Sequence, residues 1–321
     1  MSGAGAGSAA GRALRDRQHA RFAALDPLLP ATAPTIDGET LTAKLPGGGR
    51  VAGVLTKTTN GPGTLPSLWS ARQVWELYPL VGQEGAAGVD ALLGLLRELL
   101  GRLDPEDPDT ACVVTWPSRD VLVSRVLLDH GLVPLSVLAV RTDTEPEPEP
   151  EPVTPMPGVV VRRARPADLN SAVQLALAEL SYSAKVGGTV ERPDAAALKR
   201  QSLGYRIAHE DPIFLAERDG VVLGLAECWL TEGDPTAVRR FPVPPGRWGY
   251  VNTVSVLPGA RGSGVGRTLV SVVHQHMRQA GTAGSYLYYN PPNPLASVFW
   301  PRHGYRPLWT VWEVRPATAL R

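Results

Sequence analysis

The sequence predicts an α/β protein with a mixed sheet, arranged as two lobes of related design. Three observations support this fold class. Segments with strand periodicity and segments with helix periodicity alternate along most of the chain. A run of alternating Glu and Pro, residues 142–157, divides the chain into two parts. The last elements of the first part recur in the same order at the end of the second, which indicates an internal duplication.

The composition is that of a folded protein with an ordinary core. Of the 321 residues, 43% are hydrophobic and 20% are charged, and the net charge is +1. A charge so close to zero gives no strong field toward nucleic acid or an anionic membrane, so we expect neither as a partner. No run reaches the roughly 18 apolar residues that a membrane helix needs.

The cysteines and histidines do not suggest a metal. Cys112 and Cys228 lie in apolar runs, without metal-ligating or redox spacing, so we expect two buried, unpaired thiols. This usage favours a reducing, cytoplasmic location. His274 and His276 lie two apart on a predicted helix and therefore face different directions.

The first 25 residues lack the apolar core of a secretory signal, and we expect a flexible leader. Residues 26–141 then form the first lobe. Its amphipathic helix at 89–103 has the clearest pattern. The predicted strands are 41–45, 51–57, 74–82, 111–116 and 134–140, and a second helix is predicted at 119–131.

The Glu-Pro run at 142–157 reads as an extended spacer. Proline removes the backbone donor and fixes φ, and neighbouring glutamates repel one another. We therefore place the second domain at 158–321.

The second domain reads as one strand, two helices, three strands, and then helix, strand, helix and strand. Asp219-Gly220 is a hairpin signal between two of the strands. The predicted strands are 159–164, 213–220, 221–230, 249–257, 285–290 and 307–314, and the predicted helices are 166–184, 194–208, a helix that starts near Val265, and a broken helix at 294–304.

Matching residues support the duplication. His130-Gly131 in the first part corresponds to His303-Gly304 in the second, and Pro134-Leu135 to Pro307-Leu308. Each His-Gly pair ends a predicted helix, where glycine favours the left-handed cap. Two unrelated α/β halves remain the alternative interpretation.

A glycine-rich loop lies between the strand at 249–257 and the next helix. A helix N-terminus carries unpaired N–H groups and a partial positive charge, which together bind anions. Gly262, Gly264 and Gly266 would let a phosphate approach those groups, and Arg261 adds a cation. A tight turn alone would also explain the glycines. The loop lacks the Lys-Ser/Thr of a P-loop, and the domain lacks the βαβ order of a dinucleotide fold.

Two motifs together resemble the GCN5-related N-acetyltransferases. "VSVLPGARGSGVGRTLV" resembles the acyl-CoA signature of that family, and "NPLASVFWPRHGY" is similar to its downstream segment. The resemblance covers about 158–316, and the duplication resembles the two-lobed members. The residues at the defining places are Arg261, Gly264, Gly266, Asn293, Ala296, Gly304 and Tyr305.

The resemblance implies the acyl-CoA N-acyltransferase fold, with a degenerate N-terminal copy. It also implies an enzyme that uses acetyl-CoA, needs no metal and acetylates a small-molecule or peptide amine. The pantetheine arm would enter where the strand at 249–257 splays from the strand at 285–290. The implied CoA-binding residues are Val254, Val256, Arg261, Gly262, Ser263, Gly264, Val265, Gly266, Arg267 and Asn293.

Two departures from the family pattern affect the chemistry. Trp300 stands where a tyrosine usually serves as general acid, and Asn252 stands where many relatives carry a glutamate base. An indole N–H cannot deliver a proton at neutral pH. We expect Glu227 to be the substitute base and Tyr289 the substitute acid, with packing or surface roles as the alternatives. Three further tyrosines are candidates for the acid: Tyr286, Tyr288 and Tyr305.

The loop of the first lobe differs from that of the second. Aligning Gly88 with Gly264 puts Asp90 where Gly266 lies, and an anion there opposes phosphate binding. We therefore expect that the first lobe does not bind CoA. The competing function is a catalytically weak CoA-binding or protein-interaction module. Three arginines of the loop at 231–249 would contact an acidic acceptor if they reached the site, and solvated surface charge is the alternative interpretation: Arg239, Arg240 and Arg247.

Overall fold

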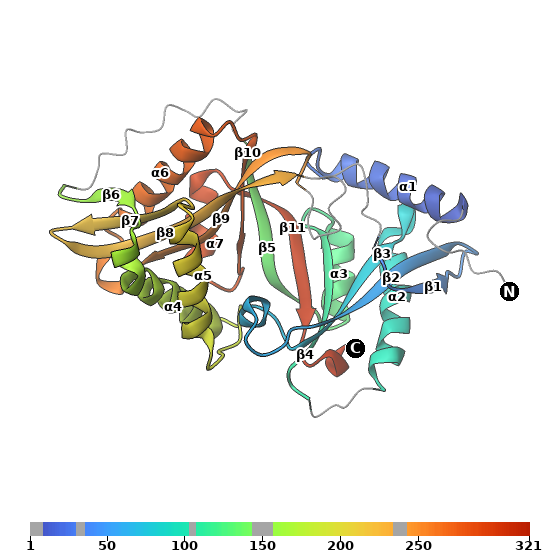
Figure 1. Cartoon of the computed structure of the whole chain (residues 1–321). Coiled ribbons are helices and arrows are strands. Elements are labelled where there is room, and N and C mark those ends of the chain that lie inside the picture. Colours follow the sequence, from blue (N-terminus) through green and yellow to red (C-terminus); the bar gives the residue numbers. More distant parts are fainter. Residues whose placement is uncertain (1–8, 30–35, 103–106, 143–156, 234–242) are drawn as a thin grey trace.

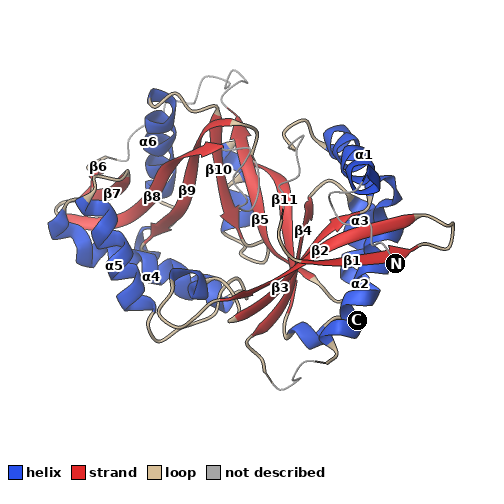
Figure 2. Ribbon diagram, turned by 45° about the vertical axis from the view of Figure 1, so that its right-hand side comes forward, coloured by secondary structure: helices blue, strands red, loops and turns tan. Residues whose placement is uncertain are grey.

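One mixed sheet of eleven strands runs through both halves of the chain (Figure 1). In the second half, helices pack on both of its faces (Figure 2). The computed structural model describes residues 9–29, 36–102, 107–142, 157–233 and 243–321.

The first half forms the elements that its periodicity predicts. Its strands alternate buried and exposed positions at the edge and become almost fully buried toward the centre, as in Thr110–Pro117. The elements are β1 (Glu39–Lys44), β2 (Arg50–Thr59), β3 (Gln73–Leu80), α2 (Gly85–Leu100), β4 (Thr110–Pro117), α3 (Val121–Asp129) and β5 (Val133–Thr142).

The second half also follows the predicted order. The hairpin at Asp219-Gly220 is confirmed, with both residues at positive φ. The strands are β6 (Val160–Arg163), β7 (Ile213–Arg218), β8 (Val221–Gly233), β9 (Gly246–Val256), β10 (Gly284–Tyr289) and β11 (Arg306–Val314), and the helices are α4 (Leu169–Lys185), α5 (Ala195–Ala208), α6 (Val265–Gln279) and the short α7 (Ala296–Phe299).

The prediction of a flexible leader is wrong for residues 9–25. They form helix α1 (Ala9–Leu25), which packs on the end of β3. Leu14 and Phe22 are buried one turn before and one turn after Gln18, which is also buried. Because a polar residue stands in the middle of this narrow stripe, the helix shows almost no apolar periodicity in the sequence.

The two halves exchange their last strands. The sheet order is β1-β2-β3-β4-β11-β5-β10-β9-β8-β7-β6. Thus β5, from the first half, lies between β10 and β11, and β11, from the second half, lies between β4 and β5. The duplication is visible in the element order, but neither half completes its own sheet.

The core follows this exchange. The largest buried cluster joins α2 and β4 of the first half to Leu308, Trp309 and Trp312 of β11. Cys112 and Cys228 are buried and unpaired, as predicted, and burial raises the pKa of both thiols to about 12.

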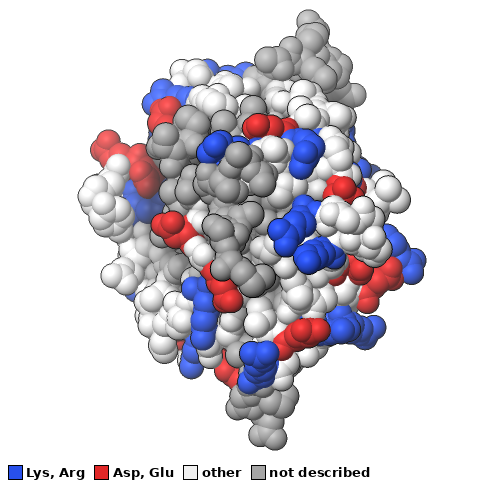
Figure 3. Space-filling model, turned by 90° about the vertical axis from the view of Figure 1, so that its right-hand side faces the viewer, with Lys and Arg blue, Asp and Glu red and all other residues white. Residues whose placement is uncertain are grey.

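The surface charge and the lengths of the helices agree with the composition of the chain. On the face shown in Figure 3, acidic and basic side chains lie interspersed, consistent with the small net charge. None of the helices among the described residues combines the length and apolar character needed to cross a bilayer.

Candidate active site

The centre of the second half contains the predicted splay between two parallel strands. β9 and β10 pair from Gly284↔Trp248 to Leu287↔Val251 and no further. Both strands continue, β9 to Val256 and β10 to Tyr289. The unpaired ends therefore open a V at the carboxyl edge of the sheet, where open sheets commonly bind ligands.

The glycine loop lies at the mouth of this V. Gly262 and Gly264 have φ of 75° and 94°, and Gly264 is the N-cap of α6. A Cβ added at either position would meet nothing within 4 Å in the protein. The space over the loop is therefore open, and the first N–H groups of α6 have no partner within the helix. This geometry is an anion cradle.

A cleft of about 1240 Å³ joins the V to the groove between α6 and α7. That volume suits a large, extended ligand. The groove is basic as well as polar. Its cationic and imidazole side chains are Arg141, Arg261, Arg267, His274, Arg278, Arg302 and His303.

Most of the predicted CoA-binding residues line this cleft. Two do not: Val265 is fully buried against the core, and Ser263 donates its hydroxyl to the Ala260 carbonyl at 2.5 Å. Asn293 lines the cleft, but its Oδ1 accepts from the N–H groups of Leu295 and Ala296 and so caps α7. The predicted residues that do line the cleft are Val254, Val256, Arg261, Gly262, Gly264, Gly266, Arg267 and Asn293.

A β-bulge in β9 shapes the inner wall. The pairing with β8 shifts between Glu227↔Thr253 and Cys228↔Val251, which leaves Asn252 unpaired in the ladder. Asn252 lines the cleft and donates its Nδ2–H to Glu227 Oε2 at 2.7 Å. The other oxygen of Glu227 accepts from Arg206 Nη1 at 2.5 Å.

These contacts do not favour the predicted role of Glu227 as base. The side chain is 3% exposed, both of its oxygens are engaged, and it is not among the residues that line the cleft. Its geometry is that of a group that fixes the position of Asn252.

Glu179 is a carboxylate that the sequence interpretation missed. It lines the cleft from α4, one turn before Tyr182 and Ser183, which line it too. Ser183 donates its hydroxyl to Glu179 Oε1 at 2.7 Å. Burial raises the pKa of Glu179, the hydrogen bond from Ser183 and the charge of Lys199 oppose the rise, and the nearby charge of Glu227 adds to it.

Glu179 is thus a carboxylate in the cleft with a hydroxyl donor beside it. In the sequence, the only signal for Glu179 is its helical spacing of three and four residues from Tyr182 and Ser183. Many surface helices have the same spacing of polar residues.

The aromatic side chains divide between the two faces of β10. Tyr289 packs with the α6 side, whereas Tyr286 and Tyr288 pack toward the other core, because side chains alternate along a strand. Tyr288 also lines the cleft. Burial raises the pKa of Tyr289, which lines the cleft. Trp300 also lines the cleft and is 8% exposed.

The remaining tyrosine candidate lies deeper. Tyr305 is 2% exposed, and its hydroxyl lies 3.0 Å from His274 Nε2 and 2.8 Å from Ser285 Oγ. It therefore joins α6 to β10 in a buried network and does not line the cleft.

Of the three arginines predicted to contact an acidic acceptor, the structure describes Arg247, and its position does not support that contact. Arg247 binds the Ala280 carbonyl and lies near Glu232, at the opposite end of β9 from the V. Arg239 and Arg240 lie outside the described residues.

The alignment of the first-lobe loop needs correction. Helix α2 starts at Gly85, so Gly88 lies inside its first turn and packs against Val81 rather than matching Gly264. Asp90 is exposed and binds His130 Nε2 at 2.8 Å. The loop preceding α2 is therefore the counterpart of residues 257–264.

The comparison with protein families agrees with the motifs. The model of the acetyltransferase (GNAT) family matches residues 177–305. Among curated proteins, a mycothiol acetyltransferase of Frankia casuarinae is 32% identical over 153 residues, and one of Streptomyces griseus is 31% identical over 152. These matches cover 44% and 46% of this chain and only 42% and 43% of the relatives' own length.

Solved structures extend the similarity to both halves. A GCN5-related N-acetyltransferase from Sphaerobacter thermophilus matches with a TM-score of 0.56 and 14% identity, over 94% of this chain and 93% of that one. An acetyltransferase of the GNAT family from Colwellia psychrerythraea matches with a TM-score of 0.50 and 14% identity, over 83% and 85%. The predicted acyl-CoA N-acyltransferase fold is confirmed.

Proposed function

We infer from the membership of residues 177–305 in the GNAT acetyltransferase family that this chain transfers an acetyl group from acetyl-CoA to an amine. The observation that carries the proposal is the open glycine cradle at the mouth of the splayed strands. The curated relatives are named for mycothiol, and we propose for this chain the broader class of small-molecule or peptide amines. The two unpaired thiols favour a cytoplasmic location.

The residues of the cleft suit acetyl-CoA. The amides of residues 262–267 and the side chains of Arg261 and Arg267 would hold the pyrophosphate. The free edge of β9 near Val254 and Val256 would pair with the pantetheine amides, as an added strand does. Acetyl-CoA, when bound, supplies the activated thioester.

We propose that Glu179 accepts the proton of the acceptor amine. An amine attacks only when neutral, and Asn252 cannot take its proton. A carboxylate whose pKa is raised toward neutrality is a better base than an ordinary one, and the hydroxyl of Ser183 holds it in place. Glu227 then acts through Asn252.

We propose that Tyr289 donates a proton to the sulfur that leaves. Trp300 cannot do so. The raised pKa of Tyr289 keeps its hydroxyl protonated, and its place on β10 borders the V. The amine nitrogen thus forms a bond to the acetyl carbon, the carbon–sulfur bond breaks, and the two protons move by way of Glu179 and Tyr289.

The binding step can be tested with Gly264→Ala. The new Cβ would meet no protein atom but would project into the space for a phosphate. We expect calorimetry to show CoA affinity reduced about tenfold or more, the scale of one lost charged hydrogen bond. Gly281→Ala is the matched control, because Gly281 follows the other end of α6, has φ of 71° and also has open space.

The two variants should lose similar stability and differ only in CoA affinity. If the unaltered protein binds neither CoA nor acetyl-CoA, the proposed function is wrong.

The base can be tested with Glu179→Gln. We expect kcat to fall about 100-fold or more while CoA affinity stays, since general bases contribute on that scale. The wild-type kcat/KM should rise with pH through a carboxyl pKa above the ordinary range, and the variant should lose this rise.

Glu227→Gln separates the two carboxylates. It removes one of the two carboxylates that pair with buried Arg206, and Asp211 stays as the other, so we expect a stability loss smaller than the roughly 3 kcal/mol of a fully unpaired buried charge. It should retain the pH-dependent rise in kcat/KM. A rise that disappears in this variant and persists in Glu179→Gln would assign the base to Glu227.

A CoA-binding or protein-interaction module with little catalysis is the second candidate. The presence of Asn252 and Trp300 at the usual base and acid positions favours it. Such a module would be stabilised by CoA but would release no thiol from acetyl-CoA with any of a broad panel of amines.

A further inference from the structure

The first half of the chain carries the same splay as the second. β3 and β4 pair in parallel from Gln73↔Thr110 to Leu77↔Val114. β3 then continues to Leu80 and β4 to Pro117 without pairing to each other. A helix start, Gly85 of α2, follows at the mouth of the opening, as Val265 of α6 does in the second half. The first half therefore repeats the backbone splay that forms the cleft of the second half, and we call this opening between the ends of β3 and β4 the first acyl-CoA groove.

A side-chain amide of helix α1 binds the backbone groups that line this groove. Gln18 Nε2 donates to the Pro79 carbonyl at 2.9 Å. Its Oε1 accepts from the N–H groups of Val81 at 2.8 Å and Gly82 at 3.3 Å. Gln18 is 6% exposed. One side-chain amide thus satisfies the strand-end and loop groups with which a ligand amide would pair.

Arg21 and Phe22 of α1 cover the opening where it meets β4 and the start of α3. The ring of Phe22 packs edge-on against Trp116 of β4 at 5.2 Å and Trp309 of β11 at 5.7 Å. Arg21 Nη2 lies 2.6 Å from Asp120 Oδ2 at the start of α3.

The same guanidinium occupies the space beside the start of α2. A Cβ added at Gly85 would meet it at 2.6 Å. In the second half, the corresponding space over Gly264 is open. The cationic role at this helix N-terminus is therefore taken by a residue of α1, paired internally with Asp120.

We propose that α1 is the permanent occupant of the first acyl-CoA groove, bound through Gln18, Arg21 and Phe22. One chain then binds one CoA, in the second half. The groove of the first half is a helix-binding site whose ligand is part of the same chain. This assignment stands whether or not the second half transfers acetyl groups.

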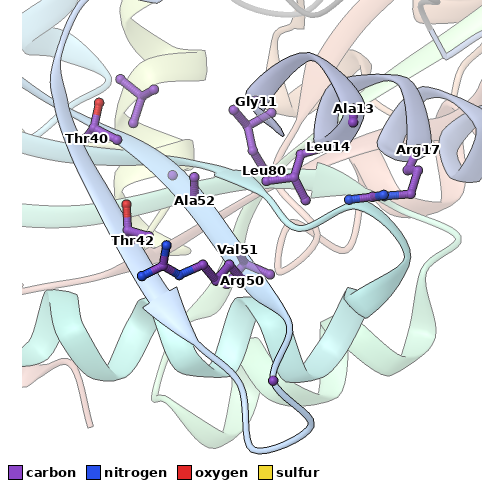
Figure 4. Close-up of a pocket in the computed structure, with 13 residues that line it drawn as sticks. Gly11, Ala13, Leu14, Arg17, Thr40, Thr42, Arg50, Val51, Ala52 and Leu80 are labelled. Atoms are coloured by element: carbon purple, nitrogen blue, oxygen red, sulfur yellow. The ribbon is translucent and has the colours of Figure 1, made fainter. Parts of the chain in front are cut away.

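A smaller cavity lies on the other side of α1, outside the opening between β3 and β4. It measures about 450 Å³ and lies between α1 and the first two strands (Figure 4). Leu14 and Leu80 line it together with the side chains of Arg17 and Arg50 at its rim. It does not include the Pro79, Val81 and Gly82 groups that Gln18 engages.

Hydrogen exchange of the full chain, with and without CoA, tests this proposal. In the unliganded protein, the amides of Val81 and Gly82 should exchange slowly. Gln18→Ala should speed their exchange about tenfold, the scale of one hydrogen bond. Asp16→Ala, at an exposed position on the same helix, should leave it unchanged. Calorimetry should give one CoA per chain.

Hydrogen exchange of the unaltered protein with added CoA shows which of the two helix starts binds CoA. CoA should slow exchange at 262–267 and leave 81–85 unchanged. Slower exchange at 81–85, or two CoA per chain, would mean that CoA displaces α1 and would overturn the proposal. Rapid exchange at Val81 and Gly82 in the unliganded protein would also overturn it. If CoA binds nowhere, the proposed function fails, while the comparison of Gln18→Ala with Asp16→Ala still decides the place of α1.

Discussion

At the scale of single residues, the site was predictable where function requires a special backbone, and unpredictable where it depends on a distant partner. Gly262 and Gly264 could be identified from the sequence because few other residues adopt positive φ there. Glu227 could not be assigned, because its role depends on Arg206, which arrives from α5. Glu179 was missed for the same reason, since only the packing of α4 over β9 brings it to the cleft.

His274 makes stability depend on pH. Burial, with Arg141, His303 and Arg278 adding to it, lowers its pKa to about 3. The unfolded chain protonates this histidine near its ordinary value of 6.5, while the folded protein keeps it neutral. Its contribution is therefore fully present above pH 6.5 and is lost as pH falls toward 3.

We expect His274→Gln to weaken this acid sensitivity. The free energy of unfolding of the unaltered protein should drop by about 2 kcal/mol more than that of the variant between pH 6.5 and pH 5. Urea unfolding at the two pH values measures it, and exposed His209→Gln serves as the control. Equal drops in all three proteins would contradict the assignment.

At the scale of elements, strands and helices followed the periodicity of the sequence except at α1. The buried stripe of α6 repeats with helical spacing through Val265, Leu269 and Val273, so its existence could be predicted. The stripe of α1 has polar Gln18 at its centre, because that position faces backbone groups rather than a core. A helix that binds a groove through an amide has no apolar pattern to reveal it.

The two corresponding helix starts differ in what covers them. At α6 the N-terminus remains open beneath Gly264. At α2 it is covered by Arg21 of α1, with Glu84 at its N-cap. The sequence predicts that the first half does not bind phosphate, because it places Asp90 at the loop. In the structure Asp90 binds His130 instead, so that reason does not hold.

At the scale of the whole molecule, strand exchange ties the halves together. Repeated His-Gly and Pro-Leu pairs predicted two lobes, yet local patterns carry no information on which neighbour a fully buried strand will choose. β5 pairs with both β10 and β11, and β11 also pairs with β4. The chain before 142 and the chain after 158 therefore share one sheet and one core.

This arrangement predicts the behaviour of a chain cut between its halves. A protease site inserted between Pro150 and Glu151 separates β5 from β6 without touching any described element. We expect the cut protein to elute from a sizing column at the position of the intact 34.2 kDa chain and to separate only in denaturant. Each fragment alone would expose the unpaired edges that β5 or β11 covers, which strongly favours association. Fragments that part under native conditions would show that the exchanged strands do not hold the halves together, because those ladders and the shared core are what would have to break.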